Sequence, residues 1–393
     1  MSNIKLRIGL VLSSVPGYSE TFFYTKINGL AKTGTEVILF ARGETNPELN
    51  CKQVRPYPVF QHPVWRALCV VLILPVVFLR APRAVVRFWK FEKEDGEITK
   101  DIFRSLYLNA HILTERVDWL HFGFATTALG RENVARAIGA KMAVSFRGYD
   151  INVYPLKNPG CYNQLWKRVD QVHSISTYLL EASYKLGLSR QTKYKIIYPA
   201  VNTIDLKQRK NFEFHTPIEL LTVSRLHKIK GLDYAIKAVS LAYNKGIELQ
   251  YSIVGDGEEL NSLKNLCASL GIQNRVKFLG RKTHLDTLDL LPQADLYIQP
   301  SINEGFCNAL LEAQGSGCLC IASRAGALPE NIIEGETGFL VSPADEVQLC
   351  ETVLQILSMS IEQRKEICFN AAKRVKEKFH IVDYIKNWER FYT

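Results

Sequence analysis

Two glutamates, Glu304 and Glu312, stand eight residues apart in the segment 300–312. This segment follows a short apolar strand at residues 294–299 and enters a helix that the pattern predicts to begin near Gly305. Such a junction presents free backbone N–H groups and the positive end of a helix dipole, which suits an anion or a polyhydroxylated ligand. At about 100° per residue, the two carboxylates would lie roughly 80° apart after two turns and could face one ligand. From spacing alone, a helix-entry glutamate and a solvated one are an equally good interpretation.

Charge and glycine also stand at the ends of two earlier predicted strands. Arg225 and Lys230 lie in a basic loop that follows the strand at residues 218–223 and leads into a helix. The strand at residues 251–254 ends in a Gly-Asp-Gly turn that begins at Gly255. A guanidinium and an ammonium on one loop can stabilise charge that develops on phosphate oxygens. The alternative is a basic loop whose charges are simply solvated.

Together these motifs resemble the donor-binding half of the retaining glycosyltransferases of family 4, which have the GT-B fold. The Arg…Lys-Gly loop, the Val-Gly-Asp-Gly turn and the Glu-x7-Glu motif occur in the order that the family has. The resemblance implies that Glu304 binds hydroxyls of the donor sugar, Glu312 binds the ribose, and Arg225 and Lys230 neutralise the departing diphosphate. The donor-binding residues that it implies, with backbone N–H groups of residues 306–308 holding oxygens, are Gly17, Gly255, Arg281, Lys282, Gly305, Phe306, Cys307, Asn308, Ala309, Leu310 and Glu312.

The resemblance implies no metal ion and no cofactor, because the nucleotide sugar is a substrate. GT-A enzymes hold magnesium with an Asp-x-Asp motif, which this sequence lacks. Retention of the anomeric configuration also comes with the resemblance. It implies departure from the front face, with the leaving phosphate taking the proton of the acceptor hydroxyl.

The first half of the chain opens with a βαβ pattern whose first strand is predicted at residues 6–12. The loop after this strand lacks Gly-x-Gly-x-x-Gly, so the fingerprint of a nicotinamide dinucleotide site is not supported. The resemblance places four residues of this loop near the donor phosphates and the acceptor: Gly17, Ser19, Glu20 and Thr21. An ordinary turn and helix start explain these residues equally well.

Arg147 stands where many family members have histidine, in the segment 145–151. Arginine stays charged and cannot exchange a proton, but it could bind a phosphate or an acidic sugar. We therefore count Arg147 among the catalytic candidates for charge stabilisation and not for proton transfer. His121, at the end of another predicted strand, could supply an imidazole, although a structural role is the favoured interpretation.

Residues 63–90 differ in composition from the rest of the chain. The uncharged run 67–79 is flanked by basic residues, which are Arg66, Arg80, Arg83, Arg87 and Lys90. Its thirteen residues are shorter than the roughly 20 that span a bilayer, and Pro75 is expected to interrupt it. Trp65 and Trp89 near its ends are typical of a membrane interface. We interpret this segment as an insertion that enters one leaflet of a membrane while its arginines contact anionic headgroups. A buried helical hairpin with a basic outer face is the alternative.

Composition fits a globular chain of two domains. It has 393 residues, 47% of them hydrophobic and 22% charged. Nine cysteines without any Cys-x-x-Cys favour a reducing cytosol, and no signal peptide is expected at the N-terminus. Residues 1–200 carry a net charge of +12 and residues 201–393 one of −2, within a total of +10. We see no nucleic-acid motif, so an anionic membrane surface is the preferred partner of the basic half.

The resemblance covers nearly the whole chain and implies an α/β protein with the GT-B fold: two Rossmann-like doubly wound domains facing across a cleft. We expect an acceptor-side domain at residues 1–202, with the insertion at about 63–90, and a linker at 203–216. A nucleotide-sugar-binding domain follows at 217–378, and a helix at 379–393 returns to the first domain. In the second domain, strands are predicted to begin near Ile218, Leu249, Val276, Leu296, Leu319 and Gly338.

Three segments, 19–22, 146–151 and 172–176, look like the bacterial exopolysaccharide and colanic-acid type of glycosyltransferase. The prediction is therefore a retaining hexosyltransferase that uses a UDP- or GDP-sugar and a lipid-linked oligosaccharide in surface polysaccharide biosynthesis. It would act in the cytoplasm at the inner face of the membrane. A sugar-nucleotide epimerase or a phosphorylase of the same fold, and a catalytically silent partner subunit, are the alternatives.

Overall fold

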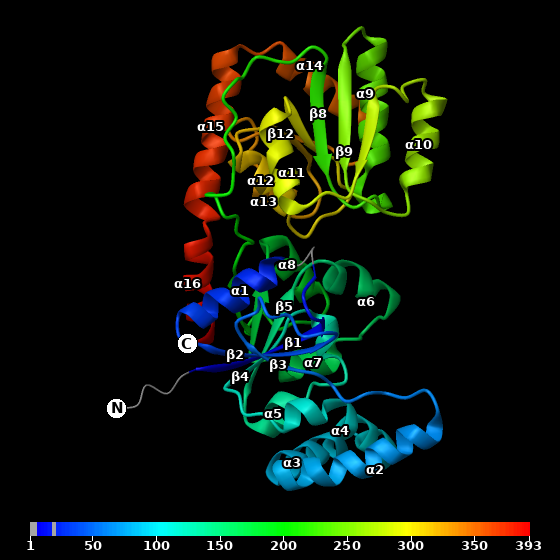
Figure 1. The fold of residues 1–393 in the computed structure, drawn as a ribbon, viewed down its shortest axis with the longest axis vertical. Coiled ribbons are helices and arrows are strands. Elements are labelled where there is room, and N and C mark those ends of the chain that lie inside the picture. Colours follow the sequence, from blue (N-terminus) through cyan, green and yellow to red (C-terminus); the bar gives the residue numbers. More distant parts are fainter. Residues whose placement is uncertain (1–5, 18–20) are drawn as a thin grey trace. The chain divides into compact units, whose positions relative to one another are not determined.

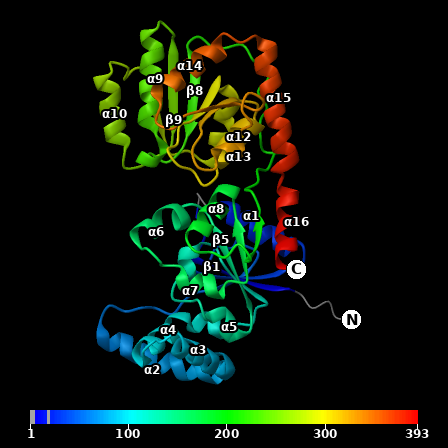
Figure 2. The same cartoon turned by 180° about the vertical axis from the view of Figure 1, so that it is seen from behind.

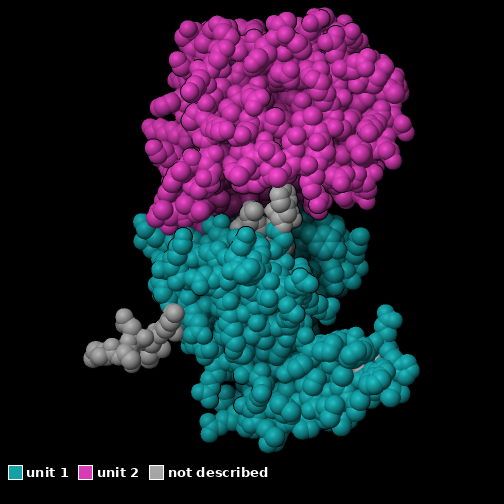
Figure 3. Space-filling view, in the orientation of Figure 1, with its two compact units in different colours: residues 1–175, 179–197, 385–393 teal, residues 176–178, 198–384 magenta. Residues whose placement is uncertain are grey.

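The computed structural model describes residues 6–17 and 21–393, and Figures 1 and 2 show its fold from two sides. The chain divides into two compact units (Figure 3). Unit 1 comprises residues 1–175, 179–197 and 385–393, and unit 2 comprises residues 176–178 and 198–384.

In the described chain, unit 1 is built on a seven-stranded parallel sheet with the order β3-β2-β1-β4-β5-β6-β7. Its strands are β1 (Arg7–Ser14), β2 (Glu36–Arg42), β3 (Lys52–Val54), β4 (Trp119–Phe122), β5 (Lys141–Phe146), β6 (Gln171–Ser174) and β7 (Lys193–Ile196). Nearly continuous apolar sequence marks β1, β2 and β5, as expected for parallel strands covered by helices on both faces. The strand order reverses between β1 and β4, and ligands of such sheets bind at this point, beyond the carboxyl ends of the strands.

The helical segments up to the second sheet are α1 (Thr21–Lys32), α2 (Pro63–Arg80), α3 (Pro82–Glu94), α4 (Thr99–Leu113), η1 (Ala125–Ala128), α5 (Val134–Ile138), η2 (Tyr149–Val153), α6 (Tyr154–Lys157), α7 (Asn163–Arg168) and α8 (Thr177–Lys185). The sequence pattern predicts one helix at residues 126–138. This prediction is wrong, because the segment is divided into η1 and α5. Gly130, with φ of +71°, turns the chain between them. Its carbonyl accepts a hydrogen bond from Asn109 Nδ2 at 3.1 Å, which holds the turn against α4.

The insertion forms two helices and not an interrupted run. α2 continues through Pro75 and ends at Arg80, so the expected interruption at Pro75 is wrong; the break comes where Pro82 begins α3. The side chain of Val77 in α2 is buried. The helices α2, α3 and α4 lie side by side in both views (Figures 1 and 2). Among the described helices none qualifies alone as a membrane span; only the pair α2–α3, bent by 113°, has the necessary length and hydropathy.

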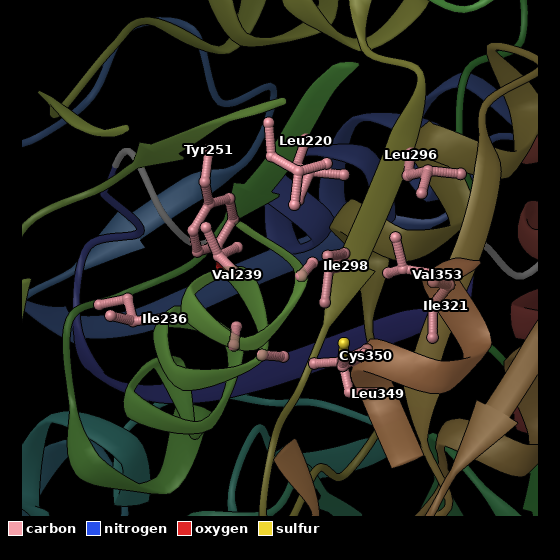
Figure 4. Packing of buried hydrophobic residues seen from close by; sticks show 14 of the residues in the cluster. Leu220, Ile236, Val239, Tyr251, Leu296, Ile298, Ile321, Leu349, Cys350 and Val353 are labelled. Carbon is pink, nitrogen blue, oxygen red and sulfur yellow. The ribbon is translucent and has the colours of Figure 1, made fainter. Parts of the chain in front are cut away.

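Unit 2 holds, among the residues described, a six-stranded parallel sheet with the order β10-β9-β8-β11-β12-β13. Its strands are β8 (Ile218–Val223), β9 (Leu249–Val254), β10 (Val276–Gly280), β11 (Leu296–Gln299), β12 (Leu319–Ser323) and β13 (Phe339–Val341), so all six predicted strands are present. Figure 4 shows the core on one face of this sheet, where Ile298 and Ile321 pack with Val239 of one helix and Val353 of another. The reversal of strand order lies between β8 and β11.

The helical segments of the second half are η3 (Lys228–Lys230), α9 (Leu232–Asn244), α10 (Leu260–Ser269), α11 (His284–Leu290), η4 (Leu291–Gln293), α12 (Asn308–Gly315), α13 (Leu328–Asn331), α14 (Glu346–Leu357), α15 (Ile361–Lys378) and α16 (Ile381–Tyr392). Two doubly wound parallel sheets in one chain confirm the predicted fold class.

The predicted return of the last helix to the first domain is also confirmed, since residues 385–393 belong to unit 1. Trp388 of α16 has no exposed surface, and Lys26 Nζ lies 3.3 Å from the centroid of its ring. Trp119 Nε1 of β4 donates a hydrogen bond to Tyr392 O at 2.9 Å. The end of the chain thereby completes the core of unit 1.

A chain of buried hydrogen bonds fixes the tautomers of two histidines in this core. Since the carbonyl of Ile197 can only accept, His173 Nε2 donates to it at 3.1 Å, and His173 Nδ1 therefore accepts from Ser145 Oγ at 2.8 Å. Ser145 Oγ in turn accepts from His121 Nε2 at 2.7 Å, and His121 Nδ1 accepts from Tyr392 Oη at 2.6 Å. Burial lowers the pKa of both imidazoles well below the ordinary value, so both are neutral. His121 thus joins the sheet to α16.

Truncation of Trp388 to alanine should destabilise unit 1 by about 3–5 kcal/mol, because a fully buried indole is replaced by a cavity next to Lys26. Denaturant unfolding of the full chain, followed by tryptophan fluorescence and by protection of the C-terminus from proteolysis, measures this effect. Arg390→Ala, an exposed position two residues later on the same helix, is the control and should change stability by less than about 0.5 kcal/mol. Equal stability of the two variants would contradict the assigned role of α16.

Candidate functional site

The loops that leave the switch point of unit 2 bring together the two residues on which the sequence motifs depend. Lys230 ends η3, just after β8, and Glu304 lies in the loop after β11, 74 residues later. Lys230 Nζ is 2.7 Å from both Glu304 Oε1 and Glu304 Oε2, and each side chain is 13% exposed. The ammonium has three donors, of which the carboxylate takes two. A half-enclosed ion pair that solvent still reaches can exchange partners with the hydroxyls and phosphate oxygens of a ligand.

Glycines permit the close approach of the loops that carry this pair. Gly231 follows Lys230 with φ of +61°, and a Cβ at this position would collide with the carbonyl of Pro300. Ile302 N donates to Ile229 O at 2.8 Å, so the two loops are also joined through their backbones. Gly255 has φ of +138°, and a Cβ there would collide with the carbonyl of Ser224. The structure therefore explains Gly255 by backbone packing beside the basic loop.

The helix of the Glu-x7-Glu motif begins later than predicted. α12 starts at Asn308 and not near Gly305, so Glu304 lies in the loop and the helical angle between the two glutamates does not apply. The reason is the side chain of Asn331, whose Oδ1 accepts from Cys307 N at 3.3 Å and whose Nδ2 donates to Cys307 O at 3.1 Å. This pair of bonds holds Cys307 extended, with φ of −119° and ψ of 107°. It also occupies one of the N–H groups expected to bind oxygens.

Within the described part of the chain, the N-cap residue Cys307 makes no side-chain capping bond to α12, so Asn308 and Ala309 present their N–H groups beside the loop that holds Glu304. By contrast, the side chains of Phe306, Cys307 and Leu310 are buried. Burial, followed by the charge of Glu304, raises the pKa of the Cys307 thiol to about 12. Cys307 is therefore a neutral packing residue and not a nucleophile, and these three residues could reach a ligand only through their backbones.

Glu312 lies in the second turn of α12 and has a partner that the sequence analysis missed. His284 Nε2 is 2.9 Å from Glu312 Oε1, and the two side chains are 47% and 15% exposed. The hydrogen bond to Glu312 raises the pKa of His284, while partial burial opposes this shift. Thr283 caps α11 by accepting from Asp286 N at 3.1 Å and so fixes the start of the helix on which His284 stands. The sequence feature that could have indicated His284 is its position directly after the Arg281-Lys282-Thr283 loop.

The remaining basic candidates of unit 2 stand on its surface. Arg225 and Arg281 are exposed, in the loops after β8 and β10, and Lys282 is half-buried beside Arg281. Long basic side chains at these positions can bind an anionic ligand. In residues 6–17 and 21–393 no group of three or more His, Cys, Asp or Glu could hold a metal ion.

Two candidate positions belong to unit 1. Arg147 follows β5, and its guanidinium lies 3.9 Å from the ring centroid of Phe22 and 4.5 Å from that of Phe23, while Nε donates to Gly123 O at 3.2 Å. Gly17 is exposed in the loop after β1, and a Cβ there would meet nothing within 4 Å. Arg147 is thus a cation held in a set orientation at the carboxyl edge of the sheet.

Three other residues of the first loop can be placed only in part. Ser19 and Glu20 lie outside the described residues. Thr21 begins α1, and its side chain is outside the description too.

Two doubly wound parallel sheets, with an ion pair and an uncapped helix at the switch point of the second, define the architecture of a GT-B glycosyltransferase. Residues 203–374 match the family model for glycosyl transferases group 1. The solved structure of Anabaena Alr3699/HepE in complex with UDP and glucose superimposes with a TM-score of 0.72 at 16% identity and covers 98% of each chain. Residues 203–374 are therefore those of a group 1, or family 4, glycosyltransferase, and the whole chain has the GT-B fold.

Two relatives in other organisms are similar over a large part of the sequence. One is the N-acetyl-alpha-D-glucosaminyl L-malate synthase of Bacillus anthracis, 27% identical over 71% of this chain and 75% of that protein. Another is the amylovoran biosynthesis glycosyltransferase AmsK of Erwinia amylovora, 24% identical over 66% of this chain and 66% of that protein. The matched segment spans about two thirds of the length of the latter.

Replacement of Glu312 by glutamine should lower the pKa of His284 towards the ordinary imidazole value near 6.5, because the hydrogen bond to a carboxylate raises it. The raised value means that this pair stabilises the fold fully below about pH 6.5, and that the contribution is lost as pH rises through the pKa of the folded state. An NMR titration of the His284 imidazole measures the change. Asp286→Asn, which removes an exposed carboxylate two residues away, is the control; an unchanged titration in Glu312→Gln would contradict the assignment.

Proposed function

We propose that this enzyme moves a hexose from a nucleotide-diphosphate sugar to a lipid-linked oligosaccharide, with retention of configuration and without a metal ion. The observation that carries the proposal is the ion pair between Lys230 and Glu304 at the switch point of unit 2. When the donor binds, sugar hydroxyls donate to Glu304, and the third donor of Lys230 reaches an oxygen of the diphosphate. Glu312 then exchanges His284 for the ribose hydroxyls.

The reaction breaks the bond between the anomeric carbon and the diphosphate oxygen and forms a bond to the acceptor oxygen. Negative charge grows on the leaving diphosphate, and Lys230, with the exposed Arg225 closing over it, stabilises that charge. The proton of the acceptor hydroxyl passes to the departing phosphate oxygen. Cys307 offers no thiolate, and Glu304 is held by Lys230, which supports departure from the front face over a covalent intermediate.

The relatives support the donor class more closely than the acceptor. Alr3699/HepE was solved with UDP and glucose, which supports a UDP-sugar as the donor. The names of the two sequence relatives point to different acceptors, since one makes an L-malate glycoside and the other acts in amylovoran biosynthesis. The support for a lipid-linked acceptor therefore comes from the surface of unit 1.

That surface is an uninterrupted apolar stripe on α2. Its exposed members, which we call the α2 stripe, are Val64, Trp65, Leu68, Val71, Leu72, Val76, Phe78 and Leu79. Recurring every three or four residues, they lie on one face of the helix over roughly 23 Å. Such a face, exposed on a folded chain, marks an interaction site. The other face packs towards α4 through Val77, so the stripe is not the core of the unit.

The neighbouring charges favour an anionic leaflet over a second copy of the chain. Arg80 ends α2, and Arg83, Arg87 and Lys90 recur at helical spacing on the exposed face of α3. A two-fold interface would set this basic face against itself, whereas headgroups of anionic lipids neutralise it. Trp89 packs edge-on against Phe103, with centroids 5.0 Å apart, so Trp65 alone of the two tryptophans is mostly exposed. We place the enzyme at the inner face of the cell membrane.

Lys230→Ala should lower kcat for sugar transfer by about 10²–10³, because one preorganised donor to the leaving diphosphate is lost. Glu304→Ala should abolish transfer and weaken donor binding, since sugar hydroxyls lose their acceptor. Radiolabelled UDP- and GDP-sugars with isolated bacterial membranes measure transfer, and thermal shifts with UDP measure binding. Lys228→Ala, an exposed lysine two residues earlier, is the matched control.

The two assays also separate an enzyme from a silent partner subunit. A wild-type chain that is stabilised by a nucleotide sugar but never transfers or hydrolyses it would favour the silent partner. UDP present at about a hundredfold over its Kd stabilises the native state by about 2.7 kcal/mol, so binding is visible even without turnover. Retention of full activity in both Lys230→Ala and Glu304→Ala would overturn the assignment of the site.

Replacement of Arg80, Arg83 and Arg87 by serine should weaken binding to vesicles of phosphatidylglycerol about 100-fold. Each basic residue near such a surface contributes about 1 kcal/mol. Co-sedimentation with vesicles of phosphatidylglycerol and of phosphatidylcholine measures the partition coefficient. Leu72→Glu, on the stripe, should reduce it as well, whereas serine at Lys245, Lys264 and Lys277, three exposed lysines of unit 2, should not. Unchanged partitioning of the triple arginine variant would refute membrane docking by this face.

A further inference from the structure

One cavity of unit 1 lies at the carboxyl edge of its sheet. It has a volume of about 270 Å³ and is lined by the carboxyl ends of β1 and β2, by the segment that follows β4, and by the last turn of α4. Its polar lining residues are Ser13, Arg42, His111, Thr126, Thr127 and Arg131. Ligands of doubly wound sheets bind at this edge, and no residue of the donor motifs contributes to the cavity.

Two arginines meet in this cavity without a carboxylate between them. Arg131 Nη1 donates to Thr127 O at 3.0 Å, and its buried Nε has no partner among the described atoms. In the described part of the chain, neither Arg131 nor Arg42 has a carboxylate oxygen within 4.0 Å. Glu132 attracts Arg131, but its carboxylate is held by backbone N–H groups of residues 130–132. The guanidinium groups of the half-buried Arg131 and the exposed Arg42 therefore line one cavity, where the attraction of Glu132 compensates Arg131 only in part.

His111 lies in the positive field of the two arginines. Its imidazole is 5% exposed and packs edge-on against Phe40, with centroids 5.9 Å apart. Burial, and then the charges of Arg131 and Arg42, lower the pKa of His111 to about 4. Burial and Arg42 likewise lower the pKa of Arg131. Like charges held together raise the free energy of the empty site, and an anion between them removes that cost.

The hydrogen-bonding groups of the cavity match an oxyanion. Guanidinium groups present paired N–H donors in the geometry of a carboxylate or a phosphate, and the hydroxyls of Ser13 and Thr126 can add single donors. Thr127 Oγ1 already donates to Phe124 O at 2.7 Å, so it positions the loop and is not counted as a donor. The volume is smaller than that of a whole nucleotide sugar site but accommodates one charged group with part of a sugar ring.

We propose that Arg42 and Arg131 form an anion subsite that binds a phosphate or carboxylate group of the acceptor. The assignment to the acceptor rests on the proposed function, in which the donor is bound by Lys230, Glu304 and Glu312 of unit 2. A lipid-linked acceptor carries phosphate next to its first sugar, whereas an acidic oligosaccharide carries carboxylate. The subsite would thus select for a charged acceptor.

The test uses the full chain and observes the His111 imidazole by NMR while inorganic phosphate or acetate is added at constant ionic strength. We expect a saturable shift and a pKa of His111 that rises from about 4, since the anion offsets both arginines. Arg131→Gln should lose the saturable shift, and Arg42→Gln, an exposed position that a folded chain tolerates, should weaken it at least tenfold. Arg136→Gln, an exposed arginine of α5, is the matched control.

The outcomes distinguish the two possible sources of the anion and the two proposals. Tighter binding of phosphate points to a phosphorylated acceptor, and tighter binding of acetate points to an acidic sugar. A linear response to both ions, or the same response in Arg42→Gln and the wild type, would refute the subsite. If UDP fails to stabilise any variant while phosphate still perturbs His111, the proposed donor function fails and the subsite stands. In the transfer assay, Arg42→Gln should raise KM for the acceptor at least tenfold and leave KM for the donor unchanged.

Discussion

The close approach of the loops after β8 and β11 is the constraint on which the proposed donor site depends. Gly231 removes the Cβ that would strike the carbonyl of Pro300, and a backbone hydrogen bond from Ile302 to Ile229 joins the loops. Only at this separation can Lys230 reach both oxygens of Glu304. Burial of one charge without the other would cost several kcal/mol, so each charge depends on its partner. In the proposed function, a donor exchanges with the same contact that joins these loops.

Much of the fold was predictable because parallel strands that are buried on both faces carry nearly continuous apolar sequence. This is why all six strands of unit 2 were located. The ends of short helices were not, because distant residues decide them. Asn331 holds Cys307 extended and delays the start of α12, and Gly130 divides a helix whose periodicity looked continuous. Propensity within a segment cannot report a hydrogen bond to a residue 24 positions away.

The candidate site was predictable as a set of residues but not as a geometry. The family motifs indicated Lys230 and Glu304, and the structure brings them into contact. They did not indicate His284, which bonds Glu312 from the start of α11, because one histidine after a basic loop has no distinctive spacing. Nor could the sequence show that Phe306 and Leu310 face the core, since an apolar pair beside a helix start fits a ligand or a core equally well. Burial of side chains separates these alternatives.

The two units manage positive charge in opposite ways, which accounts for the uneven charge of the sequence. In unit 2 the half-buried ammonium of Lys230 is neutralised by Glu304, and the half of the chain that holds it has a net charge of −2. In unit 1, Arg42 and Arg131 meet without a carboxylate among the described residues, and Arg80, Arg83 and Arg87 stand exposed near the α2 stripe. That half carries +12. Because the half-buried guanidinium of Arg131 lies beside the cation of Arg42, a ligand that supplies negative charge would stabilise this arrangement. In the proposed assignment, a donor diphosphate meets a site already balanced by its own glutamate, whereas an acceptor brings its own counter-charge to unit 1.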